Sequence, residues 1–529
     1  MARTIARRDV RDGDVVDAMD DFFLRKSESC DPQHDKFRLT EMCGFSREQC
    51  WITTSLEFTQ LRDDKTKSLF WIKGSPGTGK TIQLCGLLDE LCKVDKRSDI
   101  TSFFFCHSTD SRKNSTAAVL RGLINTLVQQ QPSLVRHICG KRMIKHQTKK
   151  TNPMIKLMDV FGNMLQDKGL RKRRIWFVVD SVDECSDMSS LLRLIRQTIS
   201  VATNLKWVIS SRSVPDIETW VQKSGDVIQL NFDQPREDLT AAINAYTRQR
   251  VQQLAKRNQY DTETECAIRK YLNEAGERVL WIALVCQSLE GIPQCDALAQ
   301  LREIPPGLRP FYVHMMRRLE RLNDGDFYKQ ILATVATVYR PITMLEMSLY
   351  IDSFGGATNE LNGLTQAVQQ CRAFVTVLNS TIYSVHSSAR DYLLENLKAS
   401  DGSFGPWLAN AHESIFFKSL EHMKSILHRD MYHLMHPAVT TQNVRRPNPD
   451  PLAGSKYACI YWIDHLEASG QPVLKYCNDS LQGNGCVVKF FREKYLYWLE
   501  CLSLLGCVAE GVCAMNKLLG FIVSVFGNC

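Results

Sequence analysis

The chain has 529 residues and a formal net charge of +8, with 44% apolar and 23% charged residues. This is the composition of a soluble globular protein that is long enough for two to four domains. Two basic runs, Lys141–Lys150 and Arg171–Arg174, contain no interleaved aromatic residues, so they are interpreted as solvated faces and not as a surface for single-stranded nucleic acid. The sequence therefore indicates no nucleic-acid partner.

The cysteines and the termini exclude several other classes of protein. Nineteen cysteines, an odd number, include no C-x-x-C pair, so neither a zinc knuckle nor a redox dithiol is indicated. We therefore expect a reducing, cytoplasmic environment. Met1–Asp20 is charged throughout and has no apolar core of a signal peptide. The longest uncharged apolar run, Leu518–Gly527, is about half the length that a membrane span needs.

The first half of the chain predicts an α/β domain. Residues 1–45 are polar and are predicted to form a disordered or poorly ordered arm, and Ser46–Arg62 a short helical lead-in. Residues 46–235 then alternate apolar runs with helical patterns, which favours a parallel sheet with crossover helices. Helices are predicted at Lys80–Val94 and Thr116–Gln130. The five predicted strands are Leu69–Lys73, Ile100–Cys106, Arg174–Val179, Leu205–Ser210 and Val227–Leu230.

Strand patterns fade in the second half of the chain. Residues 236–325 predict a helical domain, and residues 326–400 a small helical domain with one hairpin, formed by Phe374–Leu378 and Ile382–Val385. Residues 401–529 predict a C-terminal helical region. Its clearest amphipathic segments are Tyr457–Ala468 and Val487–Leu505.

A glycine-rich stretch, G-S-P-G-T-G-K-T, follows the first predicted strand and matches G-x-x-x-x-G-K-[ST] in full. Its predicted nucleotide-binding residues are Gly74, Ser75, Pro76, Gly77, Thr78, Gly79, Lys80 and Thr81. The glycines let successive N–H groups point at phosphate oxygens, and the helix that starts at Lys80 directs its positive end there. Lys80 is predicted to reach the β- and γ-phosphates and Thr81 to hold Mg²⁺. We therefore predict a site for ATP or ADP with Mg²⁺, although the motif does not distinguish ATP from GTP.

Acidic residues follow the third predicted strand, in I-W-F-V-V-D-S-V-D-E-C. Asp180 ends that strand and is predicted to hold Mg²⁺ through water, while Asp183 or Glu184 orients or deprotonates the attacking water. An acidic loop after a strand is usually a solvated turn, but its position after a P-loop favours the catalytic interpretation. Arg212 ends the fourth strand and is predicted to contact the γ-phosphate. The alternative for Arg212 is an ordinary surface arginine.

Together with S-F-F-F-C, A-A-V-L-R-G-L-I and K-W-V-I-S-S-R, these motifs resemble the NACHT branch of the STAND signal-transduction ATPases. More narrowly, they are similar to the nucleotide-binding proteins of filamentous fungi associated with heterokaryon incompatibility. The resemblance runs from about Asp31 to Asn516 and implies an α/β P-loop domain with sheet order 5-1-4-3-2. Two positions depart from the usual pattern, Ser75 in the P-loop and Ser181 after the metal-binding aspartate, and both changes are permissive.

The resemblance extends to V-H-S-S-A-R-D-Y-L, which is similar to the histidine motif of a winged-helix domain in this family. It implies that residues 326–400 are winged-helix-like and that His386 touches the β-phosphate of ADP in a closed state. From the residues alone, a single histidine beside a hairpin is more often structural. Both interpretations of His386 stay open at this point.

The family implies a nucleotide-controlled switch. ADP would hold a closed monomer, ATP would promote self-association through the nucleotide-binding domain, and slow hydrolysis would reset the switch. An effector or a repeat-bearing protein is the expected partner, because family members usually carry an effector domain and a repeat array, and neither is expected within this sequence. The alternatives are a fast ATP-driven enzyme or remodeller of the AAA or helicase type, and a scaffold that binds nucleotide without hydrolysis.

Overall fold

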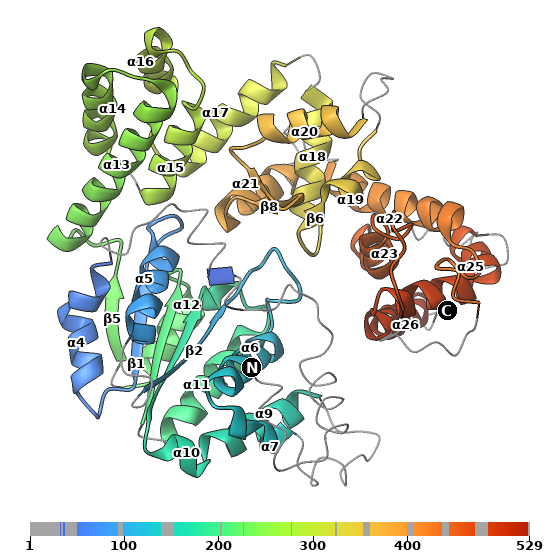
Figure 1. The fold of residues 1–529 in the computed structure, drawn as a ribbon, viewed down its shortest axis with the longest axis horizontal. Coiled ribbons are helices and arrows are strands. Elements are labelled where there is room, and N and C mark those ends of the chain that lie inside the picture. The colour runs from blue at the N-terminus through green and yellow to red at the C-terminus, as the bar shows by residue number, and fades with distance from the viewer. Residues whose placement is uncertain are drawn as a thin grey trace. The chain divides into compact units, whose positions relative to one another are not determined.

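The computed structural model describes residues 32, 35, 36, 50–93, 99–138, 153–201, 204–225, 227–276, 278–322, 325–352, 360–398, 407–435, 444–470 and 485–526. The chain divides into two compact units, Met1–Phe311 and Tyr312–Cys529 (Figure 1). The predicted disorder of residues 1–45 and the basic run Lys141–Lys150 lie outside the described residues, apart from positions 32, 35 and 36.

The first unit is built on a parallel sheet of five strands in the order β2-β3-β4-β1-β5. The strands are β1 (Leu69–Lys73), β2 (Asp99–Phe105), β3 (Arg174–Asp180), β4 (Leu205–Ser211) and β5 (Val227–Asn231). Read from the other edge, this is the predicted order 5-1-4-3-2, so the predicted α/β P-loop fold is confirmed. Because all strands are parallel, their carboxyl ends lie at one edge of the sheet, where the loops that carry the site emerge.

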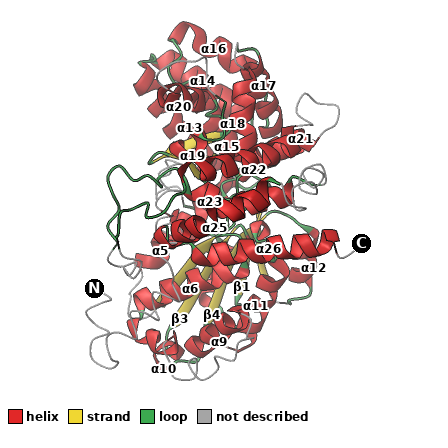
Figure 2. Cartoon of the chain, turned by 90° about the vertical axis from the view of Figure 1, so that its right-hand side faces the viewer, coloured by secondary structure: helices red, strands yellow, loops and turns green. Residues whose placement is uncertain are grey.

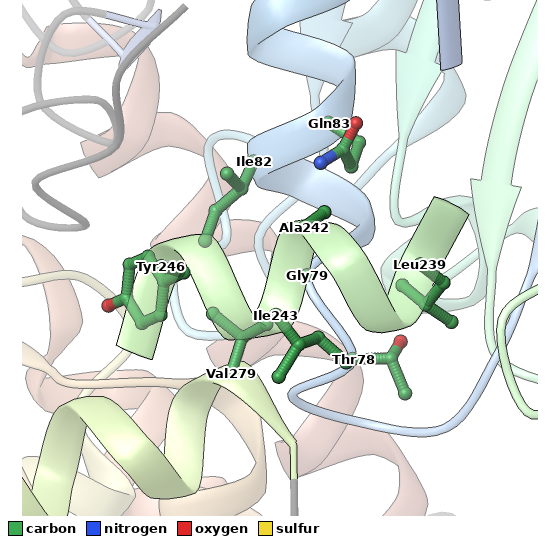
Figure 3. A pocket seen from close by; sticks show the side chains of 9 residues that line it. All are labelled: Thr78, Gly79, Ile82, Gln83, Leu239, Ala242, Ile243, Tyr246 and Val279. Carbon is green, nitrogen blue, oxygen red and sulfur yellow. The ribbon is translucent and has the colours of Figure 1, made fainter. Parts of the chain in front are cut away.

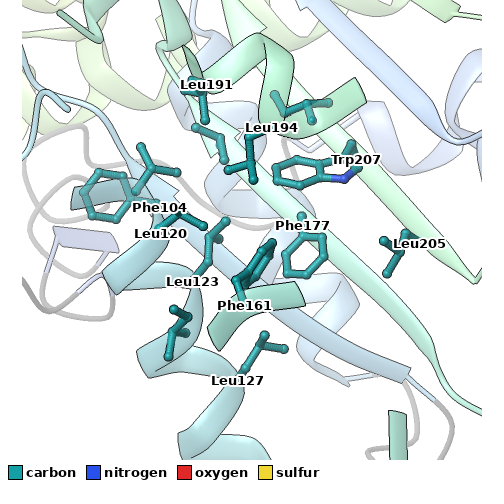
Figure 4. Close-up of a cluster of buried hydrophobic side chains, with 14 of the residues drawn as sticks. Phe104, Leu120, Leu123, Leu127, Phe161, Phe177, Leu191, Leu194, Leu205 and Trp207 are labelled. Atoms are coloured by element: carbon teal, nitrogen blue, oxygen red, sulfur yellow. The ribbon is translucent and has the colours of Figure 1, made fainter. Parts of the chain in front are cut away.

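Both faces of this sheet are buried, and each face belongs to its own hydrophobic cluster. Leu69 and Trp71 of β1 belong to one cluster, and Phe70 and Ile72 to the other, as the alternation of side chains along a strand requires. The first cluster is shown in Figure 4, with Phe104, Phe177 and Trp207 from three strands. It is covered by α6 (Thr116–Gln130), α7 (Val135–Ile138), α9 (Pro153–Leu165), α10 (Lys168–Arg171), α11 (Met188–Val201) and α12 (Pro215–Gln222). The second is covered by η4 (Ile52–Thr54), α4 (Leu56–Asp63), α5 (Lys80–Lys93) and the first turn of the helix after β5.

Helices follow the sheet in the first unit. They are α13 (Glu237–Asn258), α14 (Thr262–Glu274), α15 (Val279–Ser288) and α16 (Gln294–Glu303), and α17 (Leu308–Glu320) continues into the second unit. The chain breaks between them at residues in left-handed backbone conformations, Gln259 at φ 57° and Gly276 at φ 62°. These breaks change the direction of the chain, and the first turn of α15 contacts the P-loop through the backbone N–H of Leu280.

The second unit begins with helices around a small antiparallel sheet of order β6-β8-β7. Its elements are α18 (Gly325–Thr337), β6 (Ile342–Thr343), α19 (Met344–Ser348), α20 (Glu360–Gln370), β7 (Val375–Leu378), β8 (Thr381–Ser384) and α21 (Ser387–Lys398). The predicted hairpin is β7–β8, and Asn379 and Ser380 form its turn with φ 47° and 59°. Positive φ at both central residues matches the twist of the two strands.

The other described helices and strands of the second unit are all helices, which Figure 2 draws in red. The helices are α22 (Trp407–Ile426), α23 (Lys456–Ala468), α25 (Cys486–Leu504) and α26 (Val508–Phe526). In the part of the chain that the structure describes, no helix combines the length and the apolar character that a membrane crossing requires. The cysteines in that part carry free thiols.

Two helical glycines of the first unit give a matched test of this packing. A Cβ on Gly122 of α6 would lie 2.2 Å from a ring carbon of the buried Phe104, whereas a Cβ on Gly162 of α9 would meet no atom within 4 Å. We expect Gly122→Ala to lower the free energy of unfolding by about 1–3 kcal/mol through overpacking. Gly162→Ala should instead raise it by about 0.5–1 kcal/mol through the better helix propensity of alanine. Denaturant unfolding midpoints measure both, and equal effects of the two substitutions would contradict the packing at Gly122.

Candidate nucleotide-binding site

The P-loop connects β1 to α5 at the carboxyl edge of the sheet. Its glycines are required by geometry: Gly77 and Gly79 have φ of 77° and 95°, which side chains rarely allow. At Gly74, a Cβ would lie 2.8 Å from the Cβ of Phe232, which follows β5. The loop therefore adopts a curled backbone that residues other than glycine would strain or displace.

Lys80, the first residue of α5, lies folded over this loop. Its ammonium donates to the carbonyl oxygens of Gly74 at 2.6 Å and Ser75 at 3.0 Å, and the residue is only 9% exposed. Burial lowers the pKa of the ammonium, and the carboxylates of Asp180, Asp183 and Asp233 act in the opposite direction. A buried cation near three carboxylates is typical of a functional site, so this edge of the sheet is a candidate site.

Asp180 ends β3 and is almost fully buried beside the P-loop helix. Its carboxylate accepts hydrogen bonds from the hydroxyl of Thr81, at 2.7 Å, and from the hydroxyl of Ser210. Burial raises the pKa of the Asp180 carboxyl, while the two hydroxyl groups and Lys80 oppose that rise. The two residues predicted to bind Mg²⁺, Thr81 and Asp180, are thus in direct contact.

Ser210 was missed by sequence reasoning. It lies at the end of β4, next to β3, and its hydroxyl also accepts the backbone N–H of Ser181 at 2.9 Å. Ser181 has φ 54°, so the chain turns sharply just after Asp180. A signal was present in the sequence, because neighbouring parallel strands end at the same edge and W-V-I-S-S-R places a small polar residue there.

The structure pairs Asp183 with Arg212. The carboxylate of Asp183 accepts the backbone N–H of Arg212 at 3.0 Å and lies 3.1 Å from its guanidinium. Glu184, in the same short helix η6 (Val182–Glu184), accepts the backbone N–H of Ser108 at 2.8 Å. The predicted catalytic residues therefore lie at the same edge as the P-loop, and each is held by a defined partner.

A pocket borders the P-loop on the side of α13 and α15 (Figure 3). It is mainly apolar and has a cavity volume of about 10 Å³, room for about one water molecule. Its lining residues are Thr78, Gly79, Ile82, Gln83, Leu239, Ala242, Ile243, Tyr246 and Val279. Sequence reasoning missed this pocket, because apolar residues at helical spacing on three separate helices predict core packing equally well.

The outer side of the P-loop is held by two residues that the sequence analysis also missed. Asp233, just after β5, accepts the backbone N–H of Ser75 with both carboxylate oxygens, at 3.1 and 3.0 Å. Arg278, just before α15, donates to the carbonyl oxygen of Pro76 at 3.4 Å. The guanidinium of Arg278 lies 3.7 Å from the carboxylate of Asp233. These contacts connect the P-loop to β5 and to α15.

His386 belongs to the second unit and immediately precedes α21. Its ring nitrogen Nδ1 accepts the backbone N–H of Ser388 at 3.1 Å and lies 2.9 Å from the Ser388 hydroxyl. Because a backbone N–H only donates, Nδ1 carries no proton, and the proton of the neutral ring is on Nε2. His386 therefore has a structural role at the start of α21, and its role as a ligand of ADP stays a prediction.

Comparison with known proteins gives two kinds of result. The family model for the N-terminal part of nephrocystin 3 matches residues 48–212, which include the P-loop, Asp180 and Arg212. The vegetative incompatibility protein HET-E-1 of Podospora anserina is 38% identical over 519 residues. This match covers 94% of the chain and 38% of that relative, so the chain spans well under half of the relative's length.

Solved structures give weaker matches. The Drosophila ORC bound to DNA is 15% identical and covers 63% of this chain and 91% of its own, with a TM-score of 0.29. Cdc6p from Pyrobaculum aerophilum is 12% identical and covers 71% of this chain and 97% of its own, with a TM-score of 0.24. These TM-scores are too low to support any argument about this chain.

Proposed function

We propose that this chain, a NACHT-type protein related to the vegetative incompatibility proteins of fungi, binds ATP and ADP with Mg²⁺ and uses them as a switch. The observation that carries the proposal is the hydrogen bond of 2.7 Å from the Thr81 hydroxyl to the Asp180 carboxylate. It lies at the end of a P-loop in which Gly77 and Gly79 have positive φ. A hydroxyl and a carboxylate held together beside a phosphate-binding loop are oxygen ligands of the kind that Mg²⁺ uses in nucleotide sites.

The residues fit the nucleotide that the fold implies. The N–H groups of the P-loop and the ammonium of Lys80 would hold the phosphates, and Thr81 and Asp180 the metal ion. The apolar pocket beside Gly79 has room for about one water molecule, so α13 or α15 would have to shift before the base and ribose could be buried against these helices. Bound Mg²⁺ would neutralise phosphate charge, and the chain's own part is to position the phosphates and exclude water.

The contacts of the acidic residues support slow hydrolysis. The charge of Asp183 is paired with the guanidinium of Arg212, whereas Glu184 accepts from a neutral backbone N–H, so Glu184 is the better candidate to orient the attacking water. Glu184 is itself held by the N–H of Ser108, and both Glu184 and Arg212 would have to exchange partners before acting on water or the γ-phosphate. A reaction that first needs this rearrangement is expected to be slow. Slow hydrolysis suits a nucleotide-controlled switch better than a fast remodelling enzyme.

We extend the proposal to assembly in line with the family. ADP would favour a closed form, ATP would favour self-association through the nucleotide-binding domain, and an effector or repeat-bearing protein would be the partner. Under this proposal His386 donates from Nε2 to the β-phosphate of ADP in the closed form. The contacts at Nδ1 support the role, since they leave the proton on the nitrogen that would have to donate.

We expect Lys80→Ala to abolish nucleotide binding, because it removes the cation that lies over the P-loop. A ligand at 100 times its Kd stabilises a folded protein by about 2.7 kcal/mol, so wild type should show a clear thermal shift with MgATP and the variant none. Lys93→Ala, at the exposed end of the same helix, is the matched control and should retain the shift. A full shift in Lys80→Ala would contradict the site.

Glu184→Gln should separate binding from turnover. Glutamine can still accept the N–H of Ser108 but cannot take a proton, so Kd for ATP should stay within about twofold while hydrolysis falls by about 10²-fold or more. The wild-type rate is itself expected to be far below the value of about 10 s⁻¹ that is typical of enzymes. A rate near that value, or one stimulated by nucleic acid, would favour the fast remodeller, and no measurable hydrolysis the scaffold.

Two substitutions of His386 should distinguish its capping role from its ligand role. Asparagine caps helices well and keeps an acceptor near the position of Nδ1, whereas alanine keeps neither group. A hydrogen bond to a charged group contributes roughly 1.5–3 kcal/mol, so His386→Asn should weaken ADP binding by about ten- to a hundredfold and leave ATP binding nearly unchanged. His386→Ala should in addition lower thermal stability without nucleotide. Equal losses of ADP and ATP affinity in His386→Asn would show a purely structural residue.

A further inference from the structure

The second residue of the P-loop, Ser75, has an anionic hydrogen-bond partner. The carboxylate of Asp233 accepts the N–H of Ser75 with both oxygens, at 3.1 and 3.0 Å. It also raises the pKa of Lys80, although burial has the largest effect on that pKa and the carboxylates of Asp180 and Asp183 contribute more than Asp233 does. A carboxylate bonded to the backbone of the P-loop opposes the binding of a triphosphate there, because like charges repel over several ångströms in a partly buried site.

Arg278 is placed to offset that charge. Its guanidinium lies 3.7 Å from the carboxylate of Asp233 and 3.4 Å from the carbonyl oxygen of Pro76. Both side chains are partly exposed, Asp233 at 33% and Arg278 at 42%, so the pair is loose and open to solvent. The P-loop residues Ser75 and Pro76 are thus held between a carboxylate that follows β5 and a guanidinium that precedes α15.

The start of α15 makes a second connection to the same loop. The backbone N–H of Leu280 donates to the carbonyl oxygen of Gly77 at 3.1 Å, and a Cβ on Gly77 would lie 2.9 Å from the Cβ of Leu280. Val279 lines the pocket beside Gly79. The position of Arg278 is therefore fixed by the packing of α15 on the P-loop, and a movement of α15 would carry Arg278 with it.

We propose that Arg278 is a positioning residue that makes nucleotide affinity depend on the contact between α15 and the P-loop, by neutralising Asp233 only while α15 is docked. This inference rests on the proposed nucleotide site. When α15 moves away from the P-loop, Asp233 remains bonded to Ser75 and its charge is no longer compensated, so phosphate binding weakens and the nucleotide is released. The displacement of one helix thereby becomes a signal for nucleotide exchange.

A double-mutant cycle on the full chain tests the charge mechanism, with Kd for a fluorescent ADP analogue measured in the presence of Mg²⁺. Arg278→Gln should weaken binding by about two- to fivefold, the range expected for a partly exposed pair. Asp233→Asn keeps an acceptor for Ser75 and removes the charge, so its Kd should be equal to or smaller than that of wild type. The double variant should return to within about twofold of wild type, because the uncompensated charge is gone.

Two further variants separate charge from packing. Arg278→Lys keeps the positive charge and should retain most of the affinity. Arg257→Gln removes an arginine near the end of α13 that pairs with Glu290, and should leave Kd unchanged. The loss in Arg278→Gln should also shrink at high salt, since exposed charges are screened.

Three outcomes would contradict the role of Arg278, and they distinguish failure of this inference from failure of the nucleotide site. If the effects of Arg278→Gln and Asp233→Asn on Kd are simply additive in the double variant, Arg278 acts through packing and the inference is overturned while the nucleotide site stands. An unchanged Kd in Arg278→Gln overturns it as well. If the wild-type chain binds no nucleotide, both the inference and the proposed function fail.

Discussion

The buried carboxylate of Asp180 is the interaction on which the site depends. Through its two oxygens it joins β3 to the first turn of α5 at Thr81 and to the end of β4 at Ser210. An ionised carboxylate in such a place loses its hydration, a cost that the raised pKa of its carboxyl group reflects. The two hydroxyl groups and the cation of Lys80 offset part of that cost. The elements that would hold the proposed metal ion are therefore already held together by the chain's own hydrogen bonds.

The fold could be predicted well from the sequence wherever the pattern is local. Five strands and their order followed from apolar runs and from the family resemblance, and the P-loop from eight consecutive residues. The strand β6 (Ile342–Thr343) was not foreseen, because two residues give no alternation to detect. The long helical stretch after Asp238 was foreseen without its breaks, which depend on single residues in left-handed conformations such as Gln259.

The site itself could be predicted only in part. Lys80, Thr81 and Asp180 stand in motifs whose spacing predicts their roles, whereas the partners of Asp183 and Glu184 depend on where two other loops end. The pocket beside Gly79 and the pair Asp233–Arg278 bring together residues far apart in the chain, and nothing in their local sequence distinguishes them from ordinary core or surface positions. His386 shows a different limit: the motif suggested a ligand, and the structure adds a capping role at Nδ1 that no pattern had indicated.

The small pocket beside Gly79 also has a consequence for protein engineering. Most of its walls are aliphatic side chains from α5, α13 and α15, and it has room for about one water molecule. A larger aliphatic side chain at Ala242, one of the lining residues, could fill it without touching Lys80. Such a substitution would join the three helices more firmly and would leave the residues of the proposed metal site unchanged. The pocket therefore gives a way to bias the packing of these helices without altering the P-loop itself.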